Sequence, residues 1–348
     1  MPNPADYMYR CLQLAQLGSG NTAPNPMVGA VLVHKDRIIG EGYHEKYGGP
    51  HAEVNCLASV VATDRNLIPE STLYVSLEPC SHFGKTPPCS DLIIKEKIPN
   101  VVVGCRDPFP EVDGKGIEKL LAAGTGIRTD IMPEECIETN KRFLTFHTKK
   151  RPYIVLKWAE TADGFIGTGT ETRLQITNDY SNRLVHKWRS EESAILIGTN
   201  TALYDNPQLT NRYWSGNQPI PLVIDRNLRL PHTLELFNNP NTIIINDHKE
   251  GKYDGIRYIK IEKQDPLIPQ LTAFLYKLNI ISVLVEGGAT LLQSFLDAGI
   301  WDEARVISND QYIGGKGIKA PDFWRPDAKQ SFTLLNDRIN IFQNQPFQ

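Results

Sequence analysis

Four residues in the first half of the chain have the types and the order needed to hold a metal ion and move a proton. His51 and Glu53 lie two residues apart, and Cys80 and Cys89 follow downstream. One imidazole and two thiolates suit catalytic zinc, because three protein ligands leave a fourth position open for water. Such an ion lowers the pKa of its bound water, and a nearby carboxylate that is not a ligand carries the proton onward. The set predicts a hydrolysis that releases an amine, with Glu53 as the proton carrier.

The local backbone must bring His51 and Glu53 to the same site. Residues two apart in an ideal helix point in roughly opposite directions, at ~100° per residue, so the pair must straddle a turn-to-helix junction. Gly48-Gly49-Pro50 supplies that junction. Both cysteines are expected to precede or enter a helix, where the dipole favours thiolate. A structural zinc site without catalysis is the competing interpretation. Glu53 disfavours it, because a closed site would offer a fourth ligand.

The surrounding elements alternate between helix and strand patterns, which predicts a layered α/β sandwich. A helix carrying Met8 and Ala15 comes first, and the expected elements that follow are strands 27–33 and 37–42, helix 52–61, strand 72–77, helix 90–97, strand 100–105, helix 116–123, strand 126–131 and helix 134–145. The basic segment 148–152 ends in proline and precedes a new strand at 153–158, so we expect domains at 1–147 and 148–348. The second domain repeats the α/β pattern, with strands at 194–198, 221–225, 242–245 and 281–285 and helices at 178–189 and 291–298.

The segment between the two cysteines carries a longer pattern. It reads Glu78-Pro79-Cys80-Ser81-His82-x-Gly84-Lys85-Thr86-Pro87-Pro88-Cys89, and Asn21-Thr22-x-Pro24-Asn25-Pro26 and Gly40-Glu41-Gly42-x-His44 precede it. Nucleobase deaminases share the order of ligands but place two residues between the cysteines. With its longer spacing, the chain resembles the bifunctional riboflavin-biosynthesis family of diaminohydroxyphosphoribosylaminopyrimidine deaminase / 5-amino-6-(5-phosphoribosylamino)uracil reductase. The resemblance implies a cytidine-deaminase-like three-layer sandwich that binds Zn²⁺, followed by a dihydrofolate-reductase-like α/β domain that uses NADPH.

The same resemblance implies contacts with the substrate at the metal site. Lys85 and His82 would hold a phosphate and a ribose hydroxyl, for which a cation and an imidazole are suited. Asn25 and His44 would also contact the substrate. One position departs from the family, because Phe109 stands in Asp107-Pro108-Phe109-Pro110 where the family usually has asparagine. A polar contact at this position is therefore missing or replaced.

The second domain lacks a Gly-x-Gly-x-x-Gly run after a strand. Instead, a buried strand leads through Gly287-Gly288 into the start of a helix, which lets backbone approach a phosphate. The family resemblance implies NADPH contacts at Ala159, Thr201, Asp205, Gly288, Ala289 and Thr290. It implies contacts with the ribosyl phosphate at Arg189, Leu209, Arg212 and Glu286, and Arg173 joins them as an added cation. Arg173 and Gln175 stand where the family commonly has serine and tryptophan.

Composition limits the partners. A hydrophobic fraction of 41% and a charged fraction of 22% are typical of a soluble globular protein. The net charge of −3 argues against non-specific nucleic-acid binding. Together with the insertion between the cysteines, which suits a phosphate, it disfavours a deaminase of free nucleosides or nucleic-acid bases with an unrelated second domain. No run approaches a membrane span or a signal peptide, so we expect a cytoplasmic enzyme.

The chemistry expected of the chain is a two-step conversion of a small phosphorylated pyrimidine. The first domain would deaminate 2,5-diamino-6-ribosylamino-pyrimidinone 5′-phosphate, and the second would reduce its ribosyl group to ribityl with NADPH. A homo-oligomer is compatible with the sequence.

Overall fold

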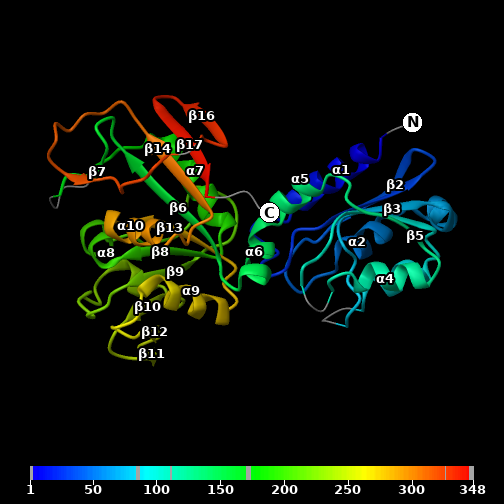
Figure 1. The fold of residues 1–348 in the computed structure, drawn as a ribbon, viewed down its shortest axis with the longest axis horizontal. Helices are drawn as coiled ribbons and strands as arrows, with labels where there is room; N and C mark the ends of the chain where they lie inside the picture. Colours follow the sequence, from blue (N-terminus) through cyan, green and yellow to red (C-terminus); the bar gives the residue numbers. More distant parts are fainter. Residues whose placement is uncertain (1–2, 84–86, 110–111, 170–173, 326, 345–348) are drawn as a thin grey trace. The chain divides into compact units, whose positions relative to one another are not determined.

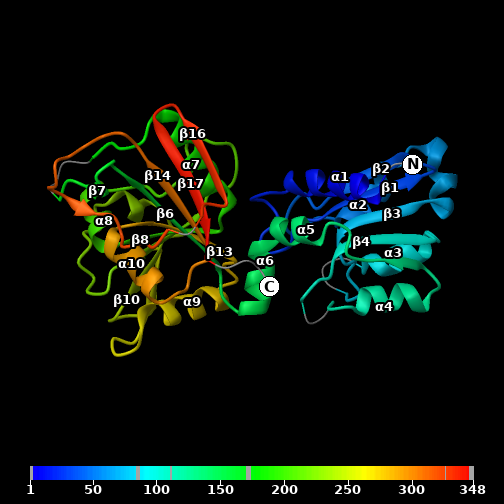
Figure 2. The same cartoon turned by 45° about the horizontal axis from the view of Figure 1, so that its top comes forward.

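The computed structural model describes residues 3–83, 87–109, 112–169, 174–325 and 327–344. The chain forms two compact units, Met1–Lys150 and Arg151–Gln348. Each unit has its own sheet and its own buried apolar core, and each is treated by itself below (Figures 1 and 2). In the part of the chain that the structure describes, we find no helix with the length and apolar character to cross a bilayer.

The first unit is built on a five-stranded sheet in the order β2-β1-β3-β4-β5. Its strands are β1 Gly29–His34, β2 Arg37–Tyr43, β3 Thr72–Leu77, β4 Asn100–Cys105 and β5 Gly126–Arg128. Its helices are α1 Pro4–Gln16, α2 Ala52–Ser59, α3 Cys89–Lys95, α4 Lys115–Ala122, α5 Pro133–Thr139 and α6 Lys141–Lys149, with a 3₁₀ segment at Ala62–Glu70. Strand β1 is antiparallel to β2 and β3, whereas β3, β4 and β5 run parallel.

Alternating residues of this sheet pack against helices on both faces. Ala30 and Leu32 lie in one core with α2, α3 and α4, whereas a side chain at Gly29 would collide with the Cys11 backbone of α1. On the face of the sheet that α1 covers, a side chain at Gly104 would also collide with the Cys136 side chain of α5. The unit is therefore the three-layer sandwich that the family resemblance implied (Figure 2).

Several elements of the first unit have other bounds than the sequence predicted, among them the strand expected at 126–131, which ends at Arg128. The single helix expected over 134–145 breaks at Asn140, because this buried side chain accepts a hydrogen bond from the Met27 N–H (2.8 Å) and donates to the Met27 carbonyl (3.0 Å). Helix α2 ends at Ser59, whose hydroxyl bonds the Cys56 carbonyl at 2.8 Å and accepts from the Glu41 N–H at 2.8 Å. Helix α6 also continues to Lys149, so the first residues of the basic segment are helical.

The second unit is built on a ten-stranded sheet in the order β11-β12-β10-β9-β8-β13-β6-β14-β17-β16, and a separate pair joins β15 to β7. Its strands are β6 Tyr153–Glu160, β7 Phe165–Gly167, β8 Ala194–Gly198, β9 Ile220–Ile224, β10 Ile243–Asn246, β11 Gly251–Tyr253, β12 Ile256–Lys260, β13 Ser282–Gly287, β14 Glu303–Ser308, β15 Ile318–Lys319, β16 Gln330–Leu334 and β17 Asp337–Gln343. Its helices are α7 Asp179–Glu191, α8 Thr199–Asp205, α9 Leu267–Lys277 and α10 Ala289–Asp297, with a 3₁₀ turn at Glu235–Asn238.

The strands from β12 to β14 in this order run parallel. Except in β12, where Arg257 and Lys260 are exposed, their side chains are largely buried on both faces, which explains the continuous apolar runs in the sequence. Helices α9 and α10 pack on one face, through Leu271 and Phe295, and α7 and α8 pack on the other, through Trp188 and Ala202. Because the strands are parallel, their carboxyl ends meet at one edge, where ligands of open α/β sheets bind.

Candidate functional site

The predicted metal ligands of the first unit come together in space. The His51 Nδ1 atom lies 3.6 Å from the Cys80 Sγ and 3.3 Å from the Cys89 Sγ, and all three ligand atoms lie within 4.8 Å of one another. A tetrahedral zinc ion would separate a nitrogen and a sulfur ligand by about 3.6 Å and two sulfur ligands by about 3.8 Å. The donor set and its spacing therefore fit zinc.

Hydrogen bonds favour the thiolate form of Cys80. A hydrogen bond from the Cys89 thiol lowers the pKa of Cys80 to about 4, although burial opposes this shift. The Cys89 backbone N–H also donates to the Cys80 Sγ at 3.3 Å. Cys89 is the first residue of α3, and Cys80 precedes that helix in the chain. The first amide of α3 reaches Cys80 across the intervening loop.

Glu53 lies in the first turn of α2, where only 3% of its surface is exposed. His51 is extended, with φ −74° and ψ 166°, and caps the same helix, so the two residues straddle the turn-to-helix junction. Burial raises the pKa of the Glu53 carboxyl, which lies within hydrogen-bonding reach of the Cys89 thiol. A carboxyl with a raised pKa beside the metal ligands is suited to accept and return a proton.

Asn25 and His44 form one wall beside the ligands. The His44 Nδ1 lies 2.9 Å from the Pro50 carbonyl oxygen, which can only accept, so Nδ1 carries the proton. The Nε2 atom is then free to accept from the Asn25 amide at 3.1 Å. Burial lowers the pKa of His44, which favours this neutral ring. The His51 ring stands edge-on to it, with centroids 5.5 Å apart.

Position 109, the departure from the family pattern, carries an aromatic contact. The Phe109 ring lies 5.8 Å from the His82 ring and 4.9 Å from the His147 ring, measured between centroids. Its backbone N–H donates to the Asp107 carboxyl at 2.8 Å, and burial raises the pKa of Asp107 to about 7. Aromatic packing therefore stands beside His82 where a polar side chain was expected. Lys85 lies outside the described residues.

The second unit contains a cavity of about 1350 Å³ at the carboxyl edge of its parallel strands. Ten of the residues predicted for the reductase line it: Ala159, Thr201, Asp205, Gly288, Ala289, Thr290, Arg189, Leu209, Arg212 and Glu286. They come from five separate elements and the loops after them, so the fold brings together what the sequence separates. The eleventh, Arg173, lies outside the described residues.

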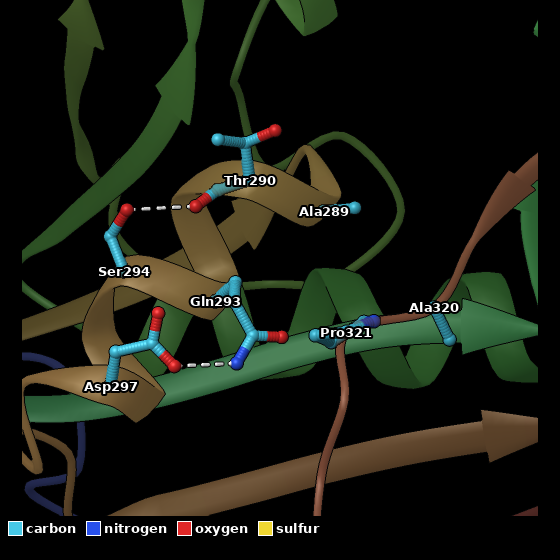
Figure 3. Close-up of a pocket in the computed structure, with 7 residues that line it drawn as sticks. All are labelled: Ala289, Thr290, Gln293, Ser294, Asp297, Ala320 and Pro321. Atoms are coloured by element: carbon cyan, nitrogen blue, oxygen red, sulfur yellow. Dashed lines mark hydrogen bonds between the residues drawn. The ribbon is translucent and has the colours of Figure 1, made fainter.

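The glycine turn links β13 to α10 at the rim of this cavity. Gly287 has φ +122°, which favours glycine, and the peptide between Gly287 and Gly288 is cis. A side chain at Gly288 would lie 3.2 Å from the Thr201 hydroxyl, so backbone rather than side chain faces that residue. A second hollow of about 330 Å³ borders the same helix start and shares Ala289, Thr290 and Ser294 with the large cavity (Figure 3).

Comparisons with known proteins show which family this chain belongs to. Residues 1–105 match the model of the cytidine and deoxycytidylate deaminase zinc-binding region, and residues 152–322 match that of the RibD C-terminal domain. The riboflavin biosynthesis protein RibD of Aquifex aeolicus is 38% identical over 342 residues, which cover 96% of this chain and 94% of that protein. The chain belongs to the RibD family.

Solved structures agree with this membership. A RibD structure from Acinetobacter baumannii has a TM-score of 0.90 at 31% identity and covers 99% of both chains. A deaminase–reductase from Thermotoga maritima has a TM-score of 0.88 at 34% identity and covers 98% of both. The chain is thus a bifunctional deaminase and reductase with zinc and NADPH as its cofactors, as the sequence indicated.

Arg189 and Glu286 form a bidentate ion pair in the cavity of this RibD-family chain. The Arg189 Nε and Nη2 atoms donate to the two Glu286 carboxylate oxygens at 2.7 and 2.6 Å, and Nη1 donates to the Thr210 carbonyl. Burial opposes ionisation of Glu286, but Arg189 outweighs it and holds the pKa of the carboxyl at about 2. Arg189 is therefore no solvated surface charge, and most of its hydrogen-bonding capacity is committed to the protein.

Replacing Arg189 by alanine is expected to destabilise the second unit by about 3–5 kcal/mol, because Glu286 would be left as an unpaired buried charge. All five tryptophans lie after residue 150, so their fluorescence follows this unit alone during urea unfolding. Replacing Glu286 by glutamine in the same chain removes the stranded charge, and the double variant should recover part of the loss. Strictly additive losses would show that the pair is not coupled.

Two further residues of this cavity were not among the sequence candidates. Lys157 lies two residues before Ala159 on β6, and His186 lies three residues before Arg189 on α7, so each shares a face with a predicted residue. The His186 Nδ1 accepts the Arg212 N–H at 2.9 Å. Burial and the nearby arginines lower the pKa of His186 to about 4, which keeps the ring neutral and able to accept. The sequence could have indicated both, because residues two apart in a strand or three apart in a helix lie on the same face.

Proposed function

We propose that this chain catalyses two successive steps on one phosphorylated pyrimidine. Its Thermotoga relative of known structure is a diaminohydroxyphosphoribosylaminopyrimidine deaminase and 5-amino-6-(5-phosphoribosylamino)uracil reductase. The observation that carries the proposal is the metal-ligand cluster with Glu53 beside it, in a chain whose second unit holds a large cavity lined by the predicted reductase residues. The first step would release ammonia from the pyrimidine ring, and the second would pass hydride to the ribose C1′ and open it to ribityl.

At the first site, His51, Cys80 and Cys89 hold zinc, and Glu53 moves the proton. Bound zinc supplies an activated water at neutral pH. Glu53 takes a proton and returns it to the departing amine, which its raised pKa supports. Asn25 and the neutral His44 orient the pyrimidine, and His82 and Lys85 hold the ribosyl phosphate. A purely structural zinc site would not place a buried carboxyl next to its ligands.

At the second site, the cofactor and the substrate share one cavity. Ala159, Thr201, Asp205 and the turn from Gly288 to Thr290 contact NADPH. Leu209, Arg212, Arg173 and the Arg189–Glu286 pair contact the ribosyl phosphate substrate. The ion pair supports this division, because it fixes the Arg189 guanidinium and leaves Arg212 and Arg173 as the cations for the phosphate.

The division of labour follows the two units. We assign deamination to residues 1–147 and reduction to residues 148–348, in a cytoplasmic enzyme that acts on a small molecule and not on nucleic acid or membrane. The net charge of −3 and the dependence on reduced thiols and NADPH support this setting. Self-association into a homo-oligomer is compatible with it.

Incubating the purified chain with the diamino-pyrimidinone phosphate tests the proposal. Ammonia should be released without NADPH, and NADPH should then be oxidised only after deamination, which nicotinamide absorbance follows separately. Oxidation of NADPH that is equally fast on a sample protected from deamination would contradict the order of steps. Release of ammonia from free cytidine instead would contradict the substrate.

A further inference from the structure

The metal-binding segment, residues 78–82, has Cys80 in its middle and is tied at its first residue to the region between β4 and α4. The buried Glu78 carboxylate accepts four backbone N–H groups, those of Asp107 at 3.3 Å, Gly114 at 3.0 Å, Gly116 at 3.0 Å and Ile117 at 3.3 Å. Hydrogen bonds from backbone N–H groups to a carboxylate are among the strong ones. The residues after β4 and the start of α4 are therefore fixed relative to the metal ligand.

Phe109, which follows β4, contacts the other end of this segment. Its N–H donates to the Asp107 carboxyl at 2.8 Å, and its carbonyl accepts the N–H groups of Val112 at 2.8 Å and Asp113 at 2.9 Å. Its ring is tilted by 57° to the His82 ring, with the centroids 5.8 Å apart. This separation is within the range in which aromatic pairs attract each other. His82 is therefore packed against a ring whose backbone is held by hydrogen bonds on both sides.

Helix α6 supports the Phe109 ring from behind through His147. The His147 centroid lies 4.9 Å from that of Phe109, 4.4 Å from that of Phe143 and 5.3 Å from that of Phe146. Burial lowers the pKa of His147 to about 4, so its ring is neutral near pH 7 and packs as an aromatic group rather than as a cation. The contact between Phe109 and His82 is thus backed by a cluster of rings from one helix.

We propose that Phe109 is a positioning residue for the deamination, which holds the His82 imidazole in the orientation that contacts the ribosyl phosphate of the substrate. The inference rests on the role of His82 in the proposed function. An imidazole forms hydrogen bonds only along the directions of its two ring nitrogens, so a ring that rotates freely loses conformational freedom when substrate binds. Asparagine has no ring for this contact, so the departure from the family pattern gives position 109 a packing role.

Steady-state deamination by the full, zinc-containing chain tests this assignment, with ammonia release measured over a range of concentrations of the diamino-pyrimidinone phosphate. Phe109→Ala should raise KM by roughly 3- to 10-fold, the factor expected from the loss of one aromatic pair. It should leave kcat and zinc content unchanged, because the metal ligands and Glu53 are untouched. Phe109→Tyr keeps the ring and should restore most of the loss, whereas Phe109→Leu keeps apolar volume without a ring and should restore less.

His82→Ala shows whether Phe109 acts through His82. This variant should raise KM by itself, by about 10-fold for one lost hydrogen bond to a charged group. Phe109→Ala should add no further increase in the His82→Ala background, because the residue that it positions is already absent. A purely structural role would instead give two increases that multiply. If Phe109→Ala fails to keep zinc, Phe109→Leu in both backgrounds answers the same question.

Tyr9→Ala is the matched control, because Tyr9 is an exposed aromatic residue of α1 in the same unit. It should leave KM unchanged. An unchanged KM in Phe109→Ala, or increases that multiply with those of His82→Ala, would overturn the positioning role while leaving the proposed function intact. If His82→Ala itself leaves KM unchanged, the role of His82 in the proposed function fails, and the Phe109 assignment fails with it.

Discussion

Replacing Glu53 by glutamine is expected to reduce ammonia release by ~10²–10⁴-fold while zinc stays bound. Glutamine has nearly the same shape but cannot accept and return a proton. The described ligand cluster consists of His51, Cys80 and Cys89, so the substitution removes no metal-binding atom. Ammonia release and zinc content, measured on the same preparation, separate the two roles.

Glu70→Gln provides the control for this variant. Glu70 is an exposed carboxylate of the same unit, at the end of its 3₁₀ segment, and its loss should leave ammonia release unchanged. Loss of zinc from the Glu53 variant would make Glu53 a ligand and would refute the proton-carrier role. NADPH binding to the second unit should be the same in both variants.

Cys80→Ser and Cys89→Ser are each expected to lose zinc and all measurable ammonia release. A serine hydroxyl does not ionise near neutral pH, so it supplies neither the charge nor the soft donor that zinc requires. Removing zinc from the unaltered chain with a chelator should have the same effect, and adding zinc back should restore activity. Zinc content by elemental analysis should fall from about one per chain.

Cys11→Ser is the matched control for these variants. The Cys11 thiol is buried and donates to the Tyr74 carbonyl at 3.4 Å, a bond that a hydroxyl can also make. This variant should therefore keep zinc and activity. Full deamination by the metal-free chain would contradict the assignment of the ligands.

The sequence predicted the parts of the fold that depend on local pattern. Strands β3 and β4 have the expected bounds, because each is a short apolar run between polar or proline residues. The break at Asn140 was missed because it depends on Met27, far away in the chain, and not on the residues around it. The small strands after β14 were missed because their burial alternates or is slight.

The candidate sites, too, were predictable where they depend on local sequence and not where they depend on contacts between distant residues. The metal ligands and Glu53 could be found from residue types and spacing, since chemistry restricts both. The pairing of Arg189 with Glu286 could not, because the two residues are 97 positions apart in the chain and meet only when α7 packs beside β13. Likewise, the hydrogen bond between Asn25 and His44 is a consequence of the fold and not of either motif.

The strand order of the second unit has a consequence for biosynthesis. Strand β6 is made first, yet Tyr153 pairs with Ser282 of β13, and Val155 pairs with Glu303 of β14. Both edges of β6 therefore stay open on the ribosome until nearly the whole chain has emerged, whereas every strand of the first unit has its partners by Arg128. Unpaired edges of apolar strands attract other chains, so the nascent reductase half is the part that depends most on chaperones. A ribosome stalled after residue 150 would already carry all four residues proposed for the zinc site, but none of the reductase.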